Sequence, residues 1–168
     1  MPIVKRSIDL LWPTESATQA FAESLATQAV LPSLRNAFIE LRGDLGAGKT
    51  TFTRHLLRAL GVQGRIKSPT FAVVEPYEVG SLQIWHFDFY RFTRAREWAD
   101  AGFRDIFASD GLKLAEWPEK AAPNLPVADI VLQLEVMDDE SNESHESRRA
   151  TVTAQTATGL ALLQGMQL

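Results

Sequence analysis

The sequence contains no cysteine. This absence excludes a disulfide scaffold, thiolate metal sites and cysteine nucleophiles, and it is typical of a reducing compartment. Long hydrophobic runs are also missing. The longest uncharged stretch, 150–168, has 19 residues but includes four Thr, three Gln and two Gly, which makes it too polar to cross a bilayer. The N-terminus lacks the apolar segment of a secretory signal. We therefore expect a cytoplasmic protein with no membrane contact.

The composition is that of an ordinary globular protein, with 168 residues, 45% apolar and 23% charged. We expect one domain, 1–168. The net charge of −4 argues against a protein held on nucleic acid by charge alone, so no DNA partner is expected. Much of that charge comes from one segment, 138–147, which we expect to be an acidic surface loop. Its acidic residues are Asp138, Asp139, Glu140, Glu143 and Glu146.

The spacing of apolar residues predicts an α/β fold with a sheet flanked by helices. Strands are expected at 4–10, 37–42, 72–79, 82–90, 112–117, 127–136 and 150–155, and helices at 13–29, 50–60 and 156–168. Gly80-Ser81 lies between two strands and predicts a hairpin, so the central sheet should mix parallel and antiparallel pairs. The helix 50–60 should bury Phe52, Leu56, Leu57 and Leu60 and expose Arg54 and Arg58. Alternation should place one set of apolar residues of 127–136 on a single face, namely Ile130, Leu132, Leu134 and Val136.

Residues 43–50 read Gly-Asp-Leu-Gly-Ala-Gly-Lys-Thr and match the phosphate-binding pattern G-x-x-x-x-G-K-[ST] at every fixed position. Glycines are needed where backbone amides converge on phosphate oxygens, because a Cβ would block the approach or the required φ. Lys49 would place its charge on the β- and γ-phosphates, and the Thr50 hydroxyl would ligate Mg²⁺. These features predict a P-loop NTPase domain. The residues expected to bind the nucleotide here are Gly43, Asp44, Leu45, Gly46, Ala47, Gly48, Lys49, Thr50 and Thr51.

The chain lacks the Asn-Lys-x-Asp motif with which GTPases read their base, so ATP is the favoured nucleotide. A P-loop site also needs a carboxylate at the tip of a neighbouring strand to hold Mg²⁺ or its water shell. Asp88 and Glu116 are both candidates. Asp88 lies within the predicted strand 82–90, and Glu116 ends the apolar run 112–116. Alternation would place His86, Asp88 and Tyr90 on one face of their strand. His86 could act as a base, although a half-buried strand histidine is the commoner outcome.

Four short motifs follow one another along the chain. They read Gly-Asp-Leu-Gly-Ala-Gly-Lys-Thr-Thr at 43–51, Ser-Pro-Thr-Phe at 68–71, His-Phe-Asp-Phe-Tyr-Arg at 86–91 and Glu-Trp-Pro-Glu at 116–119. In the second, Thr70 could sense the γ-phosphate, or Pro69 could simply build a turn. Together these motifs resemble the TsaE family, the bacterial ATPases of tRNA threonylcarbamoyladenosine synthesis. The resemblance runs from the helix start at 13–18 to about Pro118.

The resemblance implies a compact P-loop fold and a protein that binds ATP, hydrolyses it slowly alone and associates with the partner proteins TsaD and TsaB. With a separate enzyme that makes threonylcarbamoyl-AMP, that complex modifies the adenosine next to the anticodon in tRNAs that read codons beginning with A. The ATPase would reach tRNA indirectly, through the complex. It would reset the complex between turnovers rather than transfer the group itself.

Carried over by motif position, the resemblance also implies roles for individual residues. Thr50 and Glu116 would ligate Mg²⁺, and Asp88 would support catalysis or the metal shell. Lys49 would hold phosphate. These assignments lead to a mechanism in which water attacks the γ-phosphate in line while an adjacent carboxylate orients it. Trp117, next to Glu116, would respond to the nucleotide or to a partner.

Other interpretations remain open for parts of the chain. By the same resemblance, Thr14 and Arg148 would touch the base or sugar of the nucleotide. Arg91, Arg94 and Arg96 could dock a partner or tRNA, or form a solvated charged face. They could also form the lid of a small-molecule kinase, which is one alternative function. The other alternative is a non-catalytic module in which ATP holds a binding-competent shape.

Overall fold

The computed structural model describes residues 5–69, 72–92, 102–122, 124–137, 146–166 and 168. The elements are, in order, β1 (Arg6–Trp12), α1 (Glu15–Ala26), a 3₁₀ turn (Thr27–Val30), α2 (Pro32–Arg35), β2 (Phe38–Arg42), α3 (Lys49–Leu60), β3 (Val74–Val79), β4 (Leu82–Asp88), α5 (Phe103–Ala108), β5 (Leu112–Glu116), a second 3₁₀ turn (Pro118–Lys120), β6 (Ile130–Val136), β7 (Arg148–Ala154) and α6 (Ala157–Gly165). Within these ranges no helix is long and apolar enough to span a membrane.

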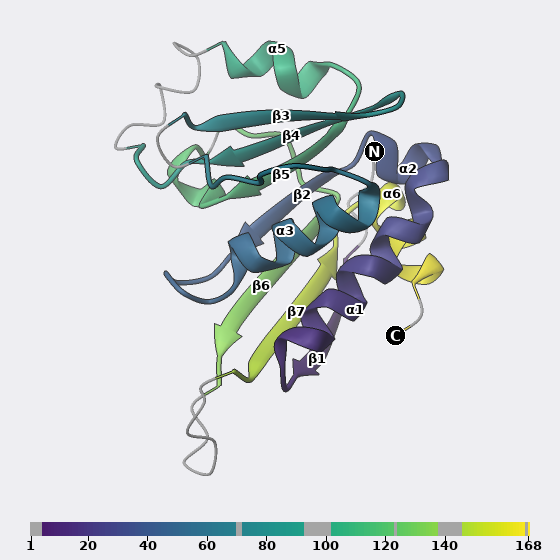
Figure 1. Cartoon of the computed structure of the whole chain (residues 1–168), viewed down its shortest axis with the longest axis vertical. Coiled ribbons are helices and arrows are strands. Elements are labelled where there is room, and N and C mark those ends of the chain that lie inside the picture. The colour runs from purple at the N-terminus through teal and green to yellow at the C-terminus, as the bar shows by residue number, and fades with distance from the viewer. Residues whose placement is uncertain (1–4, 70–71, 93–101, 123, 138–145, 167) are drawn as a thin grey trace.

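Seven strands form one sheet in the order β1-β7-β6-β2-β5-β4-β3 (Figure 1). The central strands β6, β2, β5 and β4 run parallel, while β1, β7 and β3 pair antiparallel. The mixed sheet that the hairpin signal predicts is therefore confirmed. The parallel strands β2, β4 and β5 end at the same edge of the sheet. That edge carries the loop after β2, Asp88 and Glu116, and it is where open α/β sheets bind their ligands.

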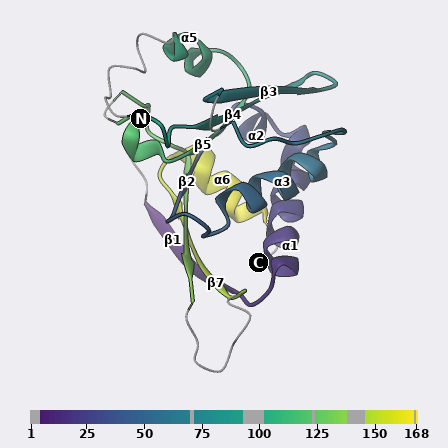
Figure 2. The same cartoon turned by 60° about the vertical axis from the view of Figure 1, so that its left-hand side comes forward.

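Helices α1 and α3 lie on one side of the sheet (Figure 2). They pack on the strand residues of that face, which include Ile39, Leu41, Ile84 and Leu114. The alternate residues, such as Phe38 and Phe87, face the opposite side and pack with Phe103 of α5 in a cluster rich in phenylalanine. The predicted faces of α3 are confirmed. Its buried residues include Phe52, Leu56, Leu57 and Leu60, and its exposed ones include Arg54 and Arg58.

The predicted strand 82–90 is too long by two residues, because β4 ends at Asp88. The Asp88 carboxylate accepts a hydrogen bond from the backbone N–H of Tyr90 at 2.9 Å, and this contact turns the chain out of the sheet. Tyr90 therefore does not continue the face that His86 and Asp88 share. His86 is fully buried rather than half-buried.

Further predicted boundaries shift by one to a few residues. Of the four residues predicted on one face of 127–136, Ile130, Leu132 and Leu134 are buried, whereas Val136 at the end of β6 is 40% exposed. The predicted helix 13–29 is α1 followed by a 3₁₀ turn, and Pro32 begins α2. The C-terminal helix α6 starts after Thr156, whose side chain caps it, and it ends at Gly165.

Candidate nucleotide-binding site

The loop between β2 and α3 has a backbone conformation that requires glycine. Gly43 has a φ of +147°, and a Cβ at this position would lie 2.5 Å from the carbonyl oxygen of Leu134. Gly48 has a φ of +109° and precedes the first turn of α3. The first N–H groups of a helix have no intrahelical partner, so this end of α3 offers the donors that phosphate oxygens accept from.

Lys49 begins α3 and is almost completely buried. Its ammonium donates to the backbone carbonyls of Gly43 and Asp44, and it lies 3.8 Å from the centre of the Trp117 ring. Burial lowers the pKa of Lys49 below its ordinary value, and the negative charges around it, Glu116 first, act in the opposite direction. The positive charge is thus held between the loop backbone and an aromatic face.

Trp117 follows β5 directly and has a left-handed backbone conformation, with a φ of +55°. This conformation costs a residue with a side chain about 1–2 kcal/mol. The ring contacts Tyr90 as well as Lys49, with a distance of 5.1 Å between the two aromatic centres. The strained backbone places the indole between the lysine and the turn after β4.

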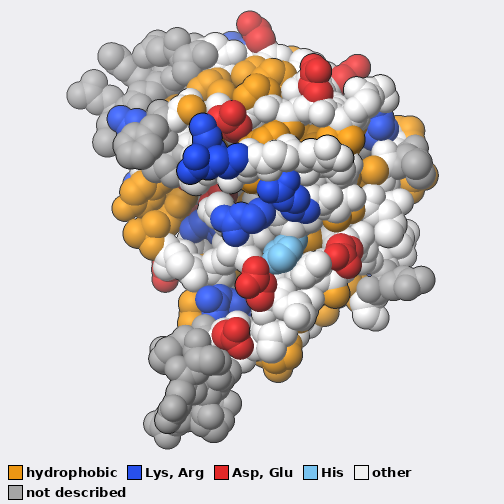
Figure 3. Space-filling view, in the orientation of Figure 1, with side chains coloured by type: hydrophobic (Ala, Val, Ile, Leu, Met, Phe, Trp, Pro, Cys, Tyr) orange, Lys and Arg blue, Asp and Glu red, His pale blue; other side chains and the backbone are white. Residues whose placement is uncertain are grey.

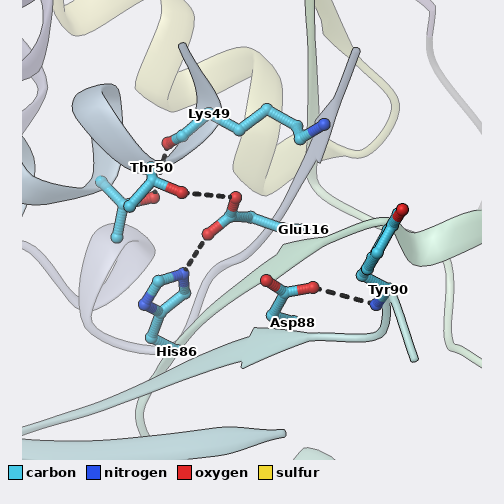
Figure 4. Close-up of polar contacts among 7 residues, drawn as sticks. Lys49, Thr50, His86, Asp88, Tyr90 and Glu116 are labelled. Carbon is cyan, nitrogen blue, oxygen red and sulfur yellow. Dashed lines mark hydrogen bonds and ion pairs between the residues drawn. The ribbon is translucent and has the colours of Figure 1, made fainter. Parts of the chain in front are cut away.

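Glu116, at the end of β5, is the buried centre of the polar contacts in the site (Figure 4). One carboxylate oxygen, Oε1, accepts a hydrogen bond from the Thr50 hydroxyl at 2.9 Å. The other, Oε2, lies 2.7 Å from Nε2 of His86. Asp88 lies opposite Glu116 in the register of β4 and β5, so the two carboxylates share the same end of the sheet. Figure 4 shows them side by side below Lys49 and Thr50.

The two ring nitrogens of His86 have different surroundings. Nδ1 is buried and has no hydrogen-bond partner among the described residues, whereas Nε2 faces the Glu116 carboxylate. We assign the ring proton to Nε2, because this tautomer donates to the carboxylate and leaves no buried N–H unpaired. His86 therefore fixes the orientation of Glu116 and leaves Oε1 for Thr50.

The donor set at this position fits Mg²⁺. Mg²⁺ prefers oxygen ligands, and in phosphate sites it takes one or two protein oxygens and completes its shell with water and phosphate oxygens. The Thr50 hydroxyl and the Glu116 carboxylate supply two such oxygens 2.9 Å apart. In the described ranges no group of three or more His, Cys, Asp or Glu side chains forms a metal cage, and Mg²⁺ needs none.

A cavity of about 370 Å³ opens over the loop. Its walls include Lys49, Thr50 and Thr51 from α3, Asp88 and Glu116 from the strand ends, and Trp117. The remaining lining residues are Asp44, Leu45, Gly46, Ala47, Gly48, Ser68, Tyr90 and Arg148. The phosphate-binding loop, both candidate carboxylates and the threonine hydroxyl therefore surround one space.

A second cavity, of about 130 Å³, adjoins the first and shares four lining residues with it, Ala47, Gly48, Thr51 and Arg148. Arg148 begins β7 and donates from Nε to the carbonyl oxygen of Ala47 at 2.9 Å, which ties β7 to the loop. The other lining residues are Trp12, Glu15, Thr18, Leu134 and Glu146.

Residues 12–149 match the family model described as "Threonylcarbamoyl adenosine biosynthesis protein TsaE". The chain belongs to the TsaE family. The TsaE protein of Haemophilus influenzae is 46% identical over 104 residues, which are 62% of this chain and 66% of that protein. The TsaE protein of Aquifex aeolicus is 35% identical over 133 residues, 78% of this chain and 89% of that protein. Both are named tRNA threonylcarbamoyladenosine biosynthesis proteins.

The fold is also similar to a solved structure, the crystal structure of Bacillus subtilis YdiB. The two chains superpose with a TM-score of 0.73 at 25% identity, over 96% of this chain and 94% of that one. The chain spans about two thirds of the length of the Haemophilus relative. The match to a nucleotide-binding family agrees with a cavity built around a phosphate-binding loop.

Most of the described residues that the resemblance to TsaE singles out lie around the two cavities, but Thr14 and Gly43 do not. Thr14 lines neither cavity, because it precedes α1 as an exposed residue, and Glu15 and Thr18 line the second cavity instead. Gly43 lines neither cavity, and its carbonyl oxygen accepts a hydrogen bond from the Lys49 ammonium. Thr70 lies outside the described residues, as do Arg94, Arg96 and most of the acidic segment, 138–145.

Three lining residues were given no role from the sequence. Trp12 ends β1, and its spacing looks like that of any strand residue. Thr18 reads as one polar position in α1. Ser68 begins the Ser-Pro-Thr-Phe motif, but only Thr70 and Pro69 of that motif were given possible roles. Glu15 could have been found from the sequence, because it directly follows Thr14, which the resemblance to TsaE places at the nucleotide.

Proposed function

We propose that this TsaE-family chain hydrolyses ATP as one component of the cytoplasmic machinery that forms threonylcarbamoyladenosine in tRNA. It would act with the partner proteins TsaD and TsaB and would reach tRNA through that complex. The observation that carries the proposal is the buried Glu116 carboxylate between Thr50 and His86, beside a phosphate-binding loop. P-loop NTPases need a carboxylate at this position. The names of the relatives support the tRNA pathway.

In the proposed site each residue has a chemical role. The amides at the start of α3 and the Lys49 ammonium would bind the phosphates and neutralise the charge that develops in the transition state. Thr50 and Glu116 would hold Mg²⁺, which supplies further positive charge to the γ-phosphate oxygens when bound. Asp88 would orient the attacking water. As the water oxygen bonds to the γ-phosphorus, the bond to the β–γ bridging oxygen breaks, and ADP and inorganic phosphate are released.

Two exposed apolar side chains at the cavity support the dependence on a partner. Leu45 is 69% exposed and Tyr90 is 39% exposed, and both line the larger cavity. Large apolar side chains that stay exposed at the rim of a cavity are typical of surfaces that a second protein covers. A partner that covers this rim would exclude water and complete the site. We therefore expect slow hydrolysis by the isolated chain.

The test is the rate of phosphate release from ATP by the chain alone and with the TsaD–TsaB pair, with and without tRNA. We expect a low rate alone and a clear rise with the pair. A Lys49→Ala variant is the control for contaminating ATPases, and it should be inactive in both samples. Equal rates with and without the pair would contradict the proposed dependence on the partner.

A further inference from the structure

One stretch of this acidic chain carries positive charges and no negative ones. Residues 45–74 contain five Lys and Arg residues and no Asp or Glu, whereas the rest of the chain has 12 basic and 21 acidic residues. Lys49 is one of the five and lies buried in the phosphate-binding loop. The other four are not used by the proposed hydrolysis.

These four side chains form one surface. Arg54 and Arg58 are one turn apart on the exposed face of α3, and residues 3 or 4 apart on a helix are neighbours. The segment after α3 runs back beside the helix (Figure 1). The Arg58 guanidinium donates to the carbonyl oxygen of Val62 in this segment at 3.0 Å. The segment also carries two more exposed cations, Arg65 and Lys67. We call Arg54, Arg58, Arg65 and Lys67 the α3 basic surface.

The charges of the α3 basic surface are available to a ligand. Within the described ranges none of the four cations forms an ion pair. His55 on the same helix differs, because its ring is 2.9 Å from the Glu15 carboxylate, so we do not count it as part of the surface. Figure 3 shows Lys and Arg side chains gathered over α3 and the segment next to it.

The surface suits a phosphate backbone better than a protein partner. The centres of protein interfaces are depleted of charge and enriched in aromatic and apolar side chains. None of the large apolar residues that are exposed lies within residues 46–69, all of which the structure describes. A group of exposed cations without an apolar centre is instead typical of a surface that binds a nucleic-acid backbone. Three of the four cations are arginines, whose planar guanidinium matches the geometry of a phosphate group.

We propose that the α3 basic surface binds the sugar–phosphate backbone of RNA. The contact is electrostatic and carries no sequence preference of its own, because contacts to phosphates do not read the bases. Lys67 is followed by Ser68, which lines the larger cavity, so the RNA backbone would lie beside the nucleotide. That this RNA is tRNA rests on the proposed function, in which the complex brings tRNA to the chain and the α3 basic surface would then contact its backbone. The binding itself does not depend on ATP hydrolysis.

The test is binding of an unmodified tRNA transcript to the full chain at several salt concentrations, followed by fluorescence anisotropy. Each phosphate contact contributes close to one unit to the slope of log affinity against log salt. The double variant Arg54→Ala/Arg58→Ala should bind more weakly and should lower the slope by about 2. The variant Arg54→Lys/Arg58→Lys keeps the charge and should keep the slope, which separates loss of charge from a folding defect.

The matched control is Arg104→Ala/Arg149→Ala. It changes the net charge equally and removes two exposed arginines from α5 and β7 instead of α3. It should bind like the wild type. Equal salt slopes in the alanine variant of α3 and in this control would overturn the proposal, since net charge alone would then set the affinity.

The same samples show whether the surface serves a protein instead. Loss of TsaD–TsaB binding in Arg54→Ala/Arg58→Ala, with tRNA binding unchanged, would make the α3 basic surface a protein interface and overturn the proposal. Partner-stimulated phosphate release, measured without RNA, separates this inference from the proposed function. If that stimulation is absent while the salt slope still falls by about 2, the proposed function fails and the RNA contact stands.

Discussion

Replacing His86 with leucine should destabilise the protein through Glu116. His86 is fully buried, and its Nε2 lies 2.7 Å from Oε2 of the carboxylate, which is itself buried. Leucine has a similar volume, so the core stays filled, but the carboxylate oxygen loses its donor. Leaving a buried hydrogen-bonding group without its partner costs about 1–3 kcal/mol, and more when the group is charged. We take about 3 kcal/mol for the free energy of unfolding, because Thr50 still donates to the other oxygen of Glu116.

Glutamine is the matched variant, because its amide nitrogen reaches the place of Nε2 and still donates to the carboxylate. His86→Gln should therefore lose less than about 1 kcal/mol. Urea unfolding measures both variants, with an unchanged denaturant slope as the check that the two-state comparison holds. If the leucine variant is as stable as the glutamine variant, the hydrogen bond to Glu116 contributes nothing and the reasoning fails.

The same pair of variants distinguishes positioning from mere stability. Because Lys49 and the loop still bind the phosphates, His86→Leu should lower kcat for ATP hydrolysis and leave KM nearly unchanged. His86→Gln should recover most of kcat. A leucine variant that is folded at the assay temperature and keeps the wild-type kcat would show that His86 acts on stability alone.

Two further predictions concern the backbone and pH. Gly43→Ala should lower the free energy of unfolding by about 2–4 kcal/mol and abolish ATP binding, because the added Cβ would meet the Leu134 carbonyl. The control is Gly64→Ala, because Gly64 also has a positive φ, +81°, but has open space around it. This control should lower the free energy of unfolding by about 1–2 kcal/mol and keep ATP binding, as calorimetry would show. Burial lowers the pKa of Lys113 below its ordinary value of 10.5. Between the lowered pKa and 10.5 the unfolded chain therefore binds more protons than the folded one. The free energy of unfolding should rise with pH in that window. Urea unfolding across that window should show a smaller rise in Lys113→Met; an unchanged rise would mean that Lys113 titrates as freely in the folded protein as in the unfolded chain.

The sequence was most informative where a function depends on neighbouring residues. The phosphate-binding loop needs glycines and a lysine at fixed short spacings, so residues 43–50 were recognisable without a structure. Asp88 and Glu116 were recognisable as carboxylates on predicted strands, although the predicted strand around Asp88 ran two residues too far. What the spacing could not show is that His86 joins Glu116, because that contact depends on the parallel register of β4 and β5.

The second cavity could not be predicted from the sequence for a related reason. Trp12 and Arg148 are 136 positions apart in the sequence, and only the pairing of β1 with β7 brings them together. No local pattern records such a pairing. Tyr90 was misplaced because alternation says which face a residue is on but not where the strand ends.

The most direct measurement of the proposed chemistry is ATP hydrolysis by Glu116→Gln, assayed as phosphate release together with ATP binding and in the presence of the TsaD–TsaB pair. Glutamine keeps the shape of the side chain and removes the charge that would hold Mg²⁺, while the loop and Lys49 are unchanged. The variant should bind ATP and hydrolyse it at least about 100-fold more slowly than the wild type. Hydrolysis at the wild-type rate would contradict the assignment of Glu116 to the catalytic site.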